Sequence, residues 1–534
     1  MAREKEILIT QFKDLVKAMD PMEIEIAKKH IIAYDSTTTG ESQKMFQIFS
    51  EVLKDNDLKY ETAKANVSPS ITETSFNRQL RRTLYRVQES LIVDVNLKRK
   101  GLYNGIFRKR YEIRKKLMQA SILLGKGLPS MAHRLFDNII KASKSFELYD
   151  ELIEALMLKQ TIILMKNEKK KFKVLKEEIA FYNRCRDLNQ ETKNFYQTYI
   201  AEQFQLGNKK NKIDFLIKHI KITQEYFFET NSANIKSQDL LLRMEYYYLL
   251  NDFNSEEKAG IELLELMAKS RAVYSKARII YVCNSLANSM IANMRFKDSY
   301  DYIQKAIENS DIRNNLNYLI GLQIQITSLF YSEKYLEARL LTDEMYTIEV
   351  LRKYPFHKAF SIFQTALNHF AEKEYKDAYV LLSNLKEIEK DKEGWNVWIR
   401  IMRILCSIEM LRLNLIDYDV ENFRRYIQRI DKLYEVRKRD KIILRVLRDL
   451  DKYDYDFQVV ADKSAALIKQ LHSTVDELKW DPKSPEMILF HDWFDAKLEK
   501  RPYQPNFEPY RAKLKEKQFN SEPLDDLLTI DKFN

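Results

Sequence analysis

Glycine and proline are scarce in this chain of 534 residues, which contains 9 Gly and 10 Pro. Average usage would give roughly 37 Gly and 27 Pro in a chain of this length. Sheets joined by tight turns need these residues, so their shortage argues for helices joined by polar loops. Loops that cradle phosphate groups are also nearly excluded, because they are rich in glycine.

Cysteines and long apolar runs are lacking as well. The three cysteines, Cys185, Cys283 and Cys406, are far apart and odd in number, which fits buried or half-buried thiols in a reducing compartment. No apolar run approaches the roughly 18 residues of a transmembrane helix. The first twenty residues space their apolar side chains as in an amphipathic helix, which is not the pattern of a signal peptide. We therefore expect a cytoplasmic protein without membrane insertion.

Motifs of catalysis and metal binding are also absent from the sequence, which has no GxGxxG, no Walker loop, no HExxH and no paired CxxC. The neighbours His491 and Asp492 lack the further ligands that a metal-dependent phosphohydrolase needs, and we expect them to have a surface or capping role. No pair of carboxylates stands out as an acid–base couple. We therefore expect neither enzyme activity nor a cofactor or metal.

A short pattern does recur along the chain, in which an aromatic residue or proline precedes a small residue by three positions. Copies begin at Pro129, Phe296, Tyr335 and Tyr375, the last three separated by 39 or 40 residues. Large apolar residues follow on the same helical face, and a second helix lies upstream. The pattern predicts antiparallel helix pairs that approach closely at small residues and must stack to bury their apolar faces. The residues expected to make this packing are Ala120, Ala132, Phe136, Ala287, Phe296, Ser299, Ile303, Tyr335, Ala338, Ala366, Tyr375, Ala378 and Leu382.

This arrangement resembles the tetratricopeptide repeat, over residues 110–390, in its two small positions, its aromatic residue and its large apolar residue. The clear spacing exceeds the roughly 34 residues of that family, and the closing proline is absent. A weaker copy begins at Phe172, and between residues 190 and 280 the pattern nearly disappears. The resemblance implies an array that binds a partner along its first helices, where Asn288, Ser289 and Gln323 are plausible contacts.

The predicted fold class is all-α, an α-solenoid of tetratricopeptide-like hairpins with a small helical N-terminal domain and a largely irregular C-terminal tail. The tail begins near Pro482, because six of the ten prolines lie at or after this residue. The tail could occupy the groove of the array as an internal ligand, either autoinhibitory or structural. The expected segments are a helical N-terminal domain at 1–95, the repeat array at 96–400, a helical cap at 401–480 and a proline-containing tail with short docked helices at 481–534.

Basic residues exceed acidic ones, with 89 Lys and Arg against 78 Asp and Glu and a net charge of +11. Most are interspersed with acids, as on a solvated helical surface. Clusters with aromatic residues between them can bind the phosphate backbone of nucleic acid. The stretch at 98–116 fits this description, with Lys98, Arg99, Lys100, Arg108, Lys109 and Arg110 as possible contacts. A small helical domain before tetratricopeptide-like repeats is also similar in layout to helix-turn-helix regulators, and this resemblance implies Arg78, Arg81 and Arg82 in the helix at 76–91 as possible contacts.

The predicted function is that of a non-enzymatic scaffold or adaptor, which binds another protein or peptide on a helical-repeat surface. Two alternatives stay open. One is a nucleic-acid-binding regulator that uses the basic helices at 76–91 or 98–116. The other is a self-assembling, filament-forming repeat protein, since solenoid ends that are not capped stack head to tail. The sequence does not identify the partner, and a second copy of the chain is among the candidates.

Overall fold

A computed structural model of the protein describes residues 2–33, 40–55, 57–93, 105–202, 209–310, 315–388, 391, 394–433 and 436–518. Within these residues the chain forms 25 α-helices and no strand. Contacts divide the chain into two compact units, Met1–Tyr103 and Asn104–Asn534. The second unit therefore contains the cap, the tail and the predicted array from residue 104 onward, while residues 96–103 of that array belong to the first unit.

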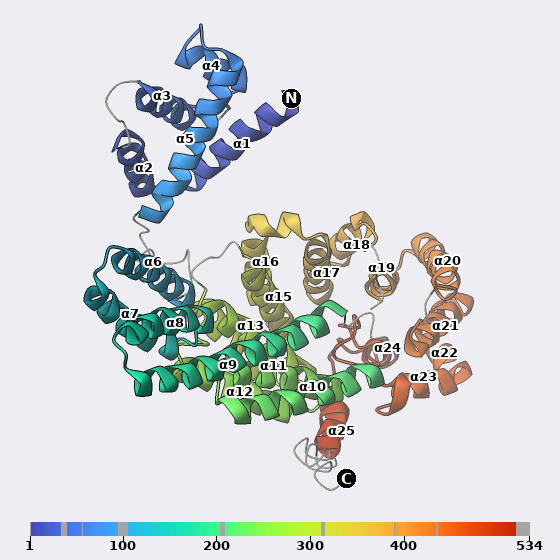
Figure 1. The fold of residues 1–534 in the computed structure, drawn as a ribbon. Coiled ribbons are helices and arrows are strands. Elements are labelled where there is room, and N and C mark those ends of the chain that lie inside the picture. Colours follow the sequence, from blue (N-terminus) through green and yellow to red (C-terminus); the bar gives the residue numbers. More distant parts are fainter. Residues whose placement is uncertain are drawn as a thin grey trace. The chain divides into compact units, whose positions relative to one another are not determined.

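The first unit is a five-helix domain (Figure 1). Its core is built around the aromatic rings of Phe12 and Phe49, which stack with centroids 6.2 Å apart. Tyr60 packs edge-on against Phe76 at 5.2 Å, so the short fourth helix is fixed to the fifth. The helices are α1 (Ala2–Ala18), α2 (Pro21–Ala33), α3 (Glu41–Lys54), α4 (Tyr60–Val67) and α5 (Glu73–Val93).

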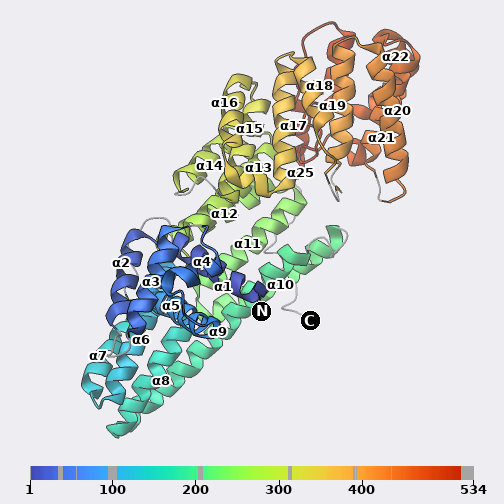
Figure 2. The same ribbon diagram turned by 90° about the horizontal axis from the view of Figure 1, so that it is seen from above.

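The second unit begins with a series of antiparallel helices in which each helix packs on the next. Figures 1 and 2 show α15 to α20 as consecutive pairs that lie side by side. This architecture confirms the predicted fold class, an all-α chain of helical-repeat type. The helices are α6 (Gly105–Gly125), α7 (Pro129–Ser145), α8 (Tyr149–Met165), α9 (Lys169–Glu202), α10 (Lys209–Thr230), α11 (Ala233–Leu250), α12 (Phe253–Lys269), α13 (Lys276–Ala292), α14 (Phe296–Glu308), α15 (Leu316–Tyr331), α16 (Tyr335–Tyr346), α17 (Pro355–Ala371), α18 (Tyr375–Asn384), α19 (Trp395–Glu409) and α20 (Leu413–Ile430).

Shorter elements complete the unit. A 3-10 helix, η1 (Glu349–Lys353), joins α16 to α17, and α20 is followed by α21 (Lys438–Lys452), α22 (Phe457–Lys463) and α23 (Ala465–Leu471). The last helices are η2 (Asp476–Leu478), α24 (Phe490–Leu498) and α25 (Glu508–Gln518), with irregular backbone between them. The odd-numbered helices α11 to α19 are the first helices of successive hairpins, and we call the surface that they share the first-helix face.

The hairpins turn in one recurring way. A residue with positive φ follows the first helix, as at Glu333 (φ 57°) and Lys373 (φ 65°). The next N–H donates to a carbonyl five residues earlier, from Lys334 to Leu329 at 2.9 Å and from Glu374 to His369 at 2.8 Å. This motif satisfies a carbonyl at the helix end and reverses the chain. The other hairpin turns place Gly127, Asn167, Asn251, Met294 and Leu411 at positive φ.

The predicted packing residues lie where the helices of each pair approach. The two aromatic residues Tyr335 and Tyr375 are half-buried, and each packs edge-on against a Phe at the end of the preceding helix, with centroids 5.6 and 5.2 Å apart. The other predicted residues are buried: Ala120, Ala132, Phe136, Ala287, Phe296, Ser299, Ile303, Ala338, Ala366, Ala378 and Leu382.

The hairpin of α11 and α12 belongs to the stretch where the sequence pattern nearly disappears. Its turn at Asn251 places Phe253 at the aromatic position and Glu256 at the small position. Gly260, one helical turn later, lies close to the first helix of the next hairpin, since an added Cβ would lie 2.8 Å from the Leu286 side chain of α13. Glu256 is fully buried and accepts a hydrogen bond from Ser289 at 2.7 Å.

The described part of the chain contains no helix that is long and apolar enough to cross a membrane. Cys185, Cys283 and Cys406 are all buried free thiols.

Candidate binding surface on the first-helix face

The tail from Trp480 to Arg511 lies across the C-terminal ends of the first helices. Each of several helices ends against a different part of the tail. Lys483 bonds to Tyr248 and Asn251 at the end of α11, Arg511 bonds to Met294 after α13, Trp480 and Phe507 pack on Tyr331 at the end of α15, and Trp493 bonds to Glu409 at the end of α19.

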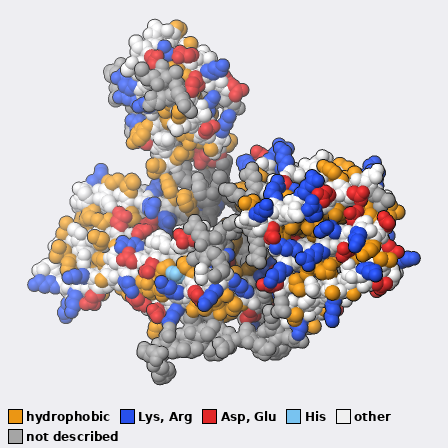
Figure 3. All heavy atoms as spheres, turned by 90° about the vertical axis from the view of Figure 1, so that its right-hand side faces the viewer, with side chains coloured by type: hydrophobic (Ala, Val, Ile, Leu, Met, Phe, Trp, Pro, Cys, Tyr) orange, Lys and Arg blue, Asp and Glu red, His pale blue; other side chains and the backbone are white. Residues whose placement is uncertain are grey.

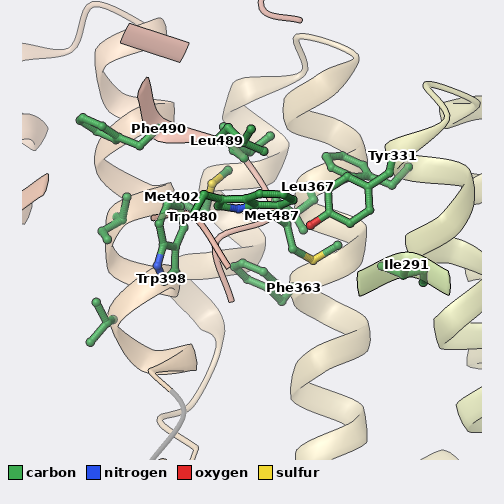
Figure 4. Close-up of a cluster of buried hydrophobic side chains, with 14 of the residues drawn as sticks. Ile291, Tyr331, Phe363, Leu367, Trp398, Met402, Trp480, Met487, Leu489 and Phe490 are labelled. Carbon is green, nitrogen blue, oxygen red and sulfur yellow. The ribbon is translucent and has the colours of Figure 1, made fainter. Parts of the chain in front are cut away.

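The tail also fills a hydrophobic space between α17 and α19. In Figure 4, Trp480 and Met487 of the tail lie between Trp398 of α19 and Leu367 of α17. Burying one large apolar side chain contributes about 1.5–3 kcal/mol. The tail is therefore part of the core of this unit. Its buried apolar side chains are Trp480, Met487, Ile488, Leu489, Phe490, Trp493, Phe494, Phe507 and Tyr510.

One buried ion pair anchors the tail to the helices before it. The guanidinium of Arg439, in α21, donates to both carboxylate oxygens of Glu486 at 2.7 and 2.8 Å. It also donates to the carbonyls of Leu471 and Leu478 at 2.7 and 2.9 Å. The exposed fractions of the Arg439 and Glu486 side chains are 3% and 0%. Most N–H donors of the Arg439 guanidinium therefore have an acceptor. A buried ion pair is tolerated in a fold only when such hydrogen bonds compensate for its lost hydration.

His491 belongs to the same buried network, so the surface part of the expected surface or capping role of His491 and Asp492 is wrong. His491 Nδ1 accepts from Arg439 at 3.0 Å, and its Nε2 lies 3.1 Å from the Tyr510 hydroxyl. Burial, with the charge of Arg439 beside it, lowers the pKa of His491 well below its usual value. Asp492 is also buried and accepts from the backbone N–H of Asn506 at 2.7 Å. The pair escaped prediction because its partners are distant in sequence.

Lys483 caps the C-terminal end of α11. Its ammonium donates to the Tyr248 carbonyl at 2.8 Å and to Asn251 Oδ1 at 2.7 Å, and lies 3.6 Å from the centroid of the Tyr248 ring. A cation is favourable here because unpaired carbonyls and the helix dipole make a helix C-terminus negative. Burial lowers the pKa of Lys483 to about 8.

A cavity of about 250 Å³ remains between the tail and the first helices. Its apolar wall is an aromatic corner formed by Phe356, Phe360 and Trp395, in which Phe360 and Trp395 lie 4.9 Å apart. Phe356 is 39% exposed. The cavity is lined by Tyr248, Asn288, Ile291, Ala292, Ile320, Gln323, Ile324, Thr327, Tyr331, Phe356, His357, Phe360 and Trp395 of the helices, and by Pro482, Lys483, Ser484 and Met487 of the tail.

Two of the three predicted groove residues line this cavity. Asn288 is exposed there. Gln323 also lines it but is buried, and its carboxamide bonds to the His357 ring at 2.8 Å and to Ser361 at 2.8 Å. Ser289 instead points into the helix packing, where it donates to Glu256. The aromatic corner was missed, although Phe356 and Trp395 begin their helices, because nothing in the sequence places these helices side by side.

Basic side chains of the first unit lie on the surface of α5. Arg78, Arg81 and Arg82 are exposed. Arg82 pairs with Glu41 at 2.7 Å, and Arg78 lies 4.0 Å from the same carboxylate. The face shown in Figure 3 likewise has Lys and Arg side chains among acidic and hydrophobic ones.

The second basic cluster is only partly described. Lys98, Arg99 and Lys100 lie outside the described residues. In α6, Lys109 pairs with Glu112 at 2.9 Å and Arg110 with Glu151 at 3.4 Å, while Arg108 is half-buried. The ion pairs on α6 therefore resemble those of an ordinary charged helix face more than an open basic strip.

One group of possible metal ligands occurs within the described residues. His369, Glu374 and Asp377 offer ligand atoms within 4.8 Å of one another. Glu374 already accepts from His369 at 2.5 Å and from Arg339 at 3.2 Å. These hydrogen bonds lower the pKa of Glu374. An arginine at this distance supplies the positive charge that a metal would bring, so the group is better described as an ion-pair network.

Comparisons with known proteins add no family to this description, since no protein-family model and no curated protein matches the sequence.

Proposed function

We propose that the protein is a binding scaffold that holds an extended segment of a partner protein in the cavity beside its tail. The observation that carries this proposal is the tail itself. It is a largely irregular segment with the short helix α24, and it contacts the first-helix face through buried aromatic side chains and through Lys483 at a helix end. The same face continues into a cavity that the tail does not fill.

The lining of the cavity indicates which segment would fit. The aromatic corner of Phe356, Phe360 and Trp395 suits one aromatic or aliphatic side chain of the partner. Asn288 is exposed beside it, where its carboxamide is suited to hydrogen-bond the partner's backbone. A segment with an apolar anchor and an extended backbone matches both features.

Crosslinking in cells that make the protein tests this proposal. A photo-crosslinking residue at Asn288 should capture one partner protein, while the same residue at Leu336 should not. Leu336 is the matched control, because it is 69% exposed on α16 and does not line the cavity. The captured segment should bind the purified protein, and Phe356→Ala should weaken binding by about tenfold or more, the range for a truncated aromatic hot spot.

Three outcomes would overturn the proposal. Equal crosslinking from Asn288 and Leu336 would show that the cavity is not a specific site. Crosslinks from Asn288 to other copies of the chain alone would favour the self-assembling alternative. Unchanged binding of the captured segment to Phe356→Ala would exclude the aromatic corner.

Nucleic-acid binding is a second candidate, favoured by one observation. Arg78, Arg81 and Arg82 are all exposed along α5. Replacing the three with Gln should abolish binding of duplex DNA at low salt if α5 contacts phosphates, and the affinity of the unchanged protein should fall steeply with salt. Equal binding by both proteins would exclude this helix.

A further inference from the structure

A second cavity lies at the other end of the array, about 260 Å³ in volume and lined by α6, α8, α9, α11 and α13. It is separate from the cavity beside the tail and shares no lining residue with it. Four cationic side chains line it, Arg110, Arg186, Lys193 and Arg278, against two acids, Glu147 and Asp150.

Two of these cations have no carboxylate partner among the described residues. Lys193 is half-buried in α9 and makes no ion pair or hydrogen bond. Arg278, in α13, donates only to the Ser237 hydroxyl at 3.1 Å. Arg110 is 3.4 Å from Glu151, but Arg114 binds that carboxylate more closely, at 2.7 Å. Burial and the charges of Arg110 and Arg278 lower the pKa of Lys193, and the weaker opposing effect of Asp150 and Glu147 does not cancel them.

The two acids offset this charge only in part, and neither forms an ion pair with Lys193 or Arg278. Glu147 is occupied at the N-terminus of α11, where it accepts from Ser232 at 2.6 Å, from the Ala233 N–H at 2.7 Å and from Asn234 at 2.9 Å. Asp150 is exposed at the rim, and Arg186 pairs with its neighbour Asp187 at 2.9 Å.

One buried acceptor is also unpartnered. Asn189 lines the cavity and is 6% exposed, and its carboxamide oxygen has no hydrogen-bond partner in the described structure. Buried polar atoms are nearly always bonded, so an exception calls for an explanation. A ligand hydroxyl in the cavity would supply the missing donor.

The arginine cluster between α19 and α20 shows what a structural cluster looks like in this chain. It lines a cavity of about 340 Å³, yet its arginines are paired. Arg400 and Arg429 contact Glu387, Arg403 contacts Asp419 at 2.5 Å, and Arg425 contacts Glu421 at 2.8 Å. In contrast, Lys193 and Arg278 in the cavity between α9 and α13 have no carboxylate partner among the described residues.

We propose that the cavity formed by Arg110, Lys193 and Arg278 binds the phosphate group of a small phosphorylated metabolite that also carries a hydroxyl group. Two guanidinium forks and one ammonium suit a phosphate dianion, the arginines through paired N–H donors and the lysine as a point charge. The volume is near the lower end of small-molecule sites, which excludes large ligands.

Calorimetric titration of the full-length protein at constant ionic strength tests this assignment. Glycerol 3-phosphate should bind more tightly than inorganic phosphate, because it adds a hydroxyl for Asn189, and malate should bind least. Lys193→Gln should weaken glycerol 3-phosphate binding by about ten- to hundredfold, the range for a lost charge-assisted hydrogen bond.

A milder pair of variants guards against misfolding of Lys193→Gln. Gln190 and Gln197 are both exposed on α9, but only Gln190 lines the cavity. Gln190→Glu should weaken phosphate binding about three- to tenfold by repulsion, while Gln197→Glu leaves it unchanged. The proposal is overturned if neither phosphate compound binds, if malate binds as tightly as glycerol 3-phosphate, or if the two Glu variants behave alike.

Discussion

Arg439 and Lys193 are both cations withdrawn from water in the second unit, but only Arg439 has a carboxylate partner. Glu486 meets the Arg439 guanidinium with two hydrogen bonds, and carbonyls of two further residues accept from it. Lys193 shares its cavity with three arginines and two acids but forms an ion pair with neither acid. A charge whose partners are all supplied by the chain stabilises the fold, whereas one left without a partner is suited to a ligand.

The difference also separates two roles that the sequence left open for the tail. If the tail were autoinhibitory and could detach, the first-helix face beneath it would have to be stable when exposed to solvent. Removing this tail would instead take Glu486 away from Arg439 and uncover apolar side chains such as Tyr331, on which Trp480 and Phe507 pack. The contacts therefore favour a structural tail, and they leave the adjacent cavity for a partner.

Breaking the paired cation should have the largest effect. Glu486→Gln removes the charge that neutralises Arg439, and we expect it to lower the free energy of unfolding by about 3–5 kcal/mol. Urea denaturation would measure the loss. Glu499→Gln is the control, because Glu499 is exposed in the same tail and its one ion pair among the described residues is with Arg501. A similar loss in both variants would contradict the role of the buried pair.

Acid should act on the same region through His491. Its pKa is lowered in the fold, so the unfolded chain binds a proton more readily, and stability is lost as pH falls below about 6.5. The slope from this group is up to about 1.4 kcal/mol per pH unit. Opposite slopes come from Asp492, whose pKa is raised to about 6 by burial, and His472, whose pKa is raised by Asp495.

Comparison with His491→Asn isolates the histidine, since Asp492 and His472 are present in both proteins. The free energy of unfolding of the variant should fall less steeply between pH 6.5 and 5 than that of the unchanged protein. Parallel curves would mean that His491 is protonated without cost in the fold, contrary to its contact with Arg439.

Removing the unpaired cation should have a smaller effect of opposite sign. Lys193→Met relieves the repulsion from Arg110 and Arg278, and we expect the ligand-free protein to gain on the order of 1 kcal/mol. Thermal unfolding of the two ligand-free proteins would measure the gain. Destabilisation by this variant would show that the ammonium has a structural partner after all.

Supplying a carboxylate to the same cavity should have the smallest effect. Gln190→Glu would stabilise the ligand-free protein by about 0.2–1 kcal/mol, as for an exposed ion pair, and Gln197→Glu by less. Equal urea midpoints for the unfolding of the two variants would show that the cations of the cavity do not attract a carboxylate at residue 190.

The parts of this fold that could be predicted are those set by local spacing. The sequence Tyr375, Ala378 and Leu382 places an aromatic, a small and a large residue on one helix, and the buried contacts of Ala378 and Leu382 follow. The repeat pattern is lost in the α11–α12 hairpin because the buried carboxylate of Glu256 stands at the small position and accepts a hydrogen bond from Ser289 of α13.

Register and long-range contacts were harder to predict. The weak copy was placed at Phe172, but the turn at Asn167 puts its aromatic position three residues earlier, at Lys169. The position of the tail depends on contacts between residues distant in sequence, such as Trp480 with Tyr331, which no local sequence pattern predicts. The unpaired state of Lys193 also depends on helices α6, α9 and α13 meeting, and so it could be recognised only in three dimensions.

Native-state hydrogen exchange of the tail tests most directly the central claim that the chain completes its own first-helix face and leaves only the adjacent cavity to a partner. The backbone N–H of Trp493, bonded to Leu489 at 3.0 Å, and that of Glu499, bonded to Asp495 at 2.9 Å, report on the docked segment. We predict that the Trp493 amide exchanges only through global unfolding, with the same free energy as amides in the middle of α19. Exchange of the tail at a much lower free energy, while α19 stays protected, would show a detachable strap and contradict the account.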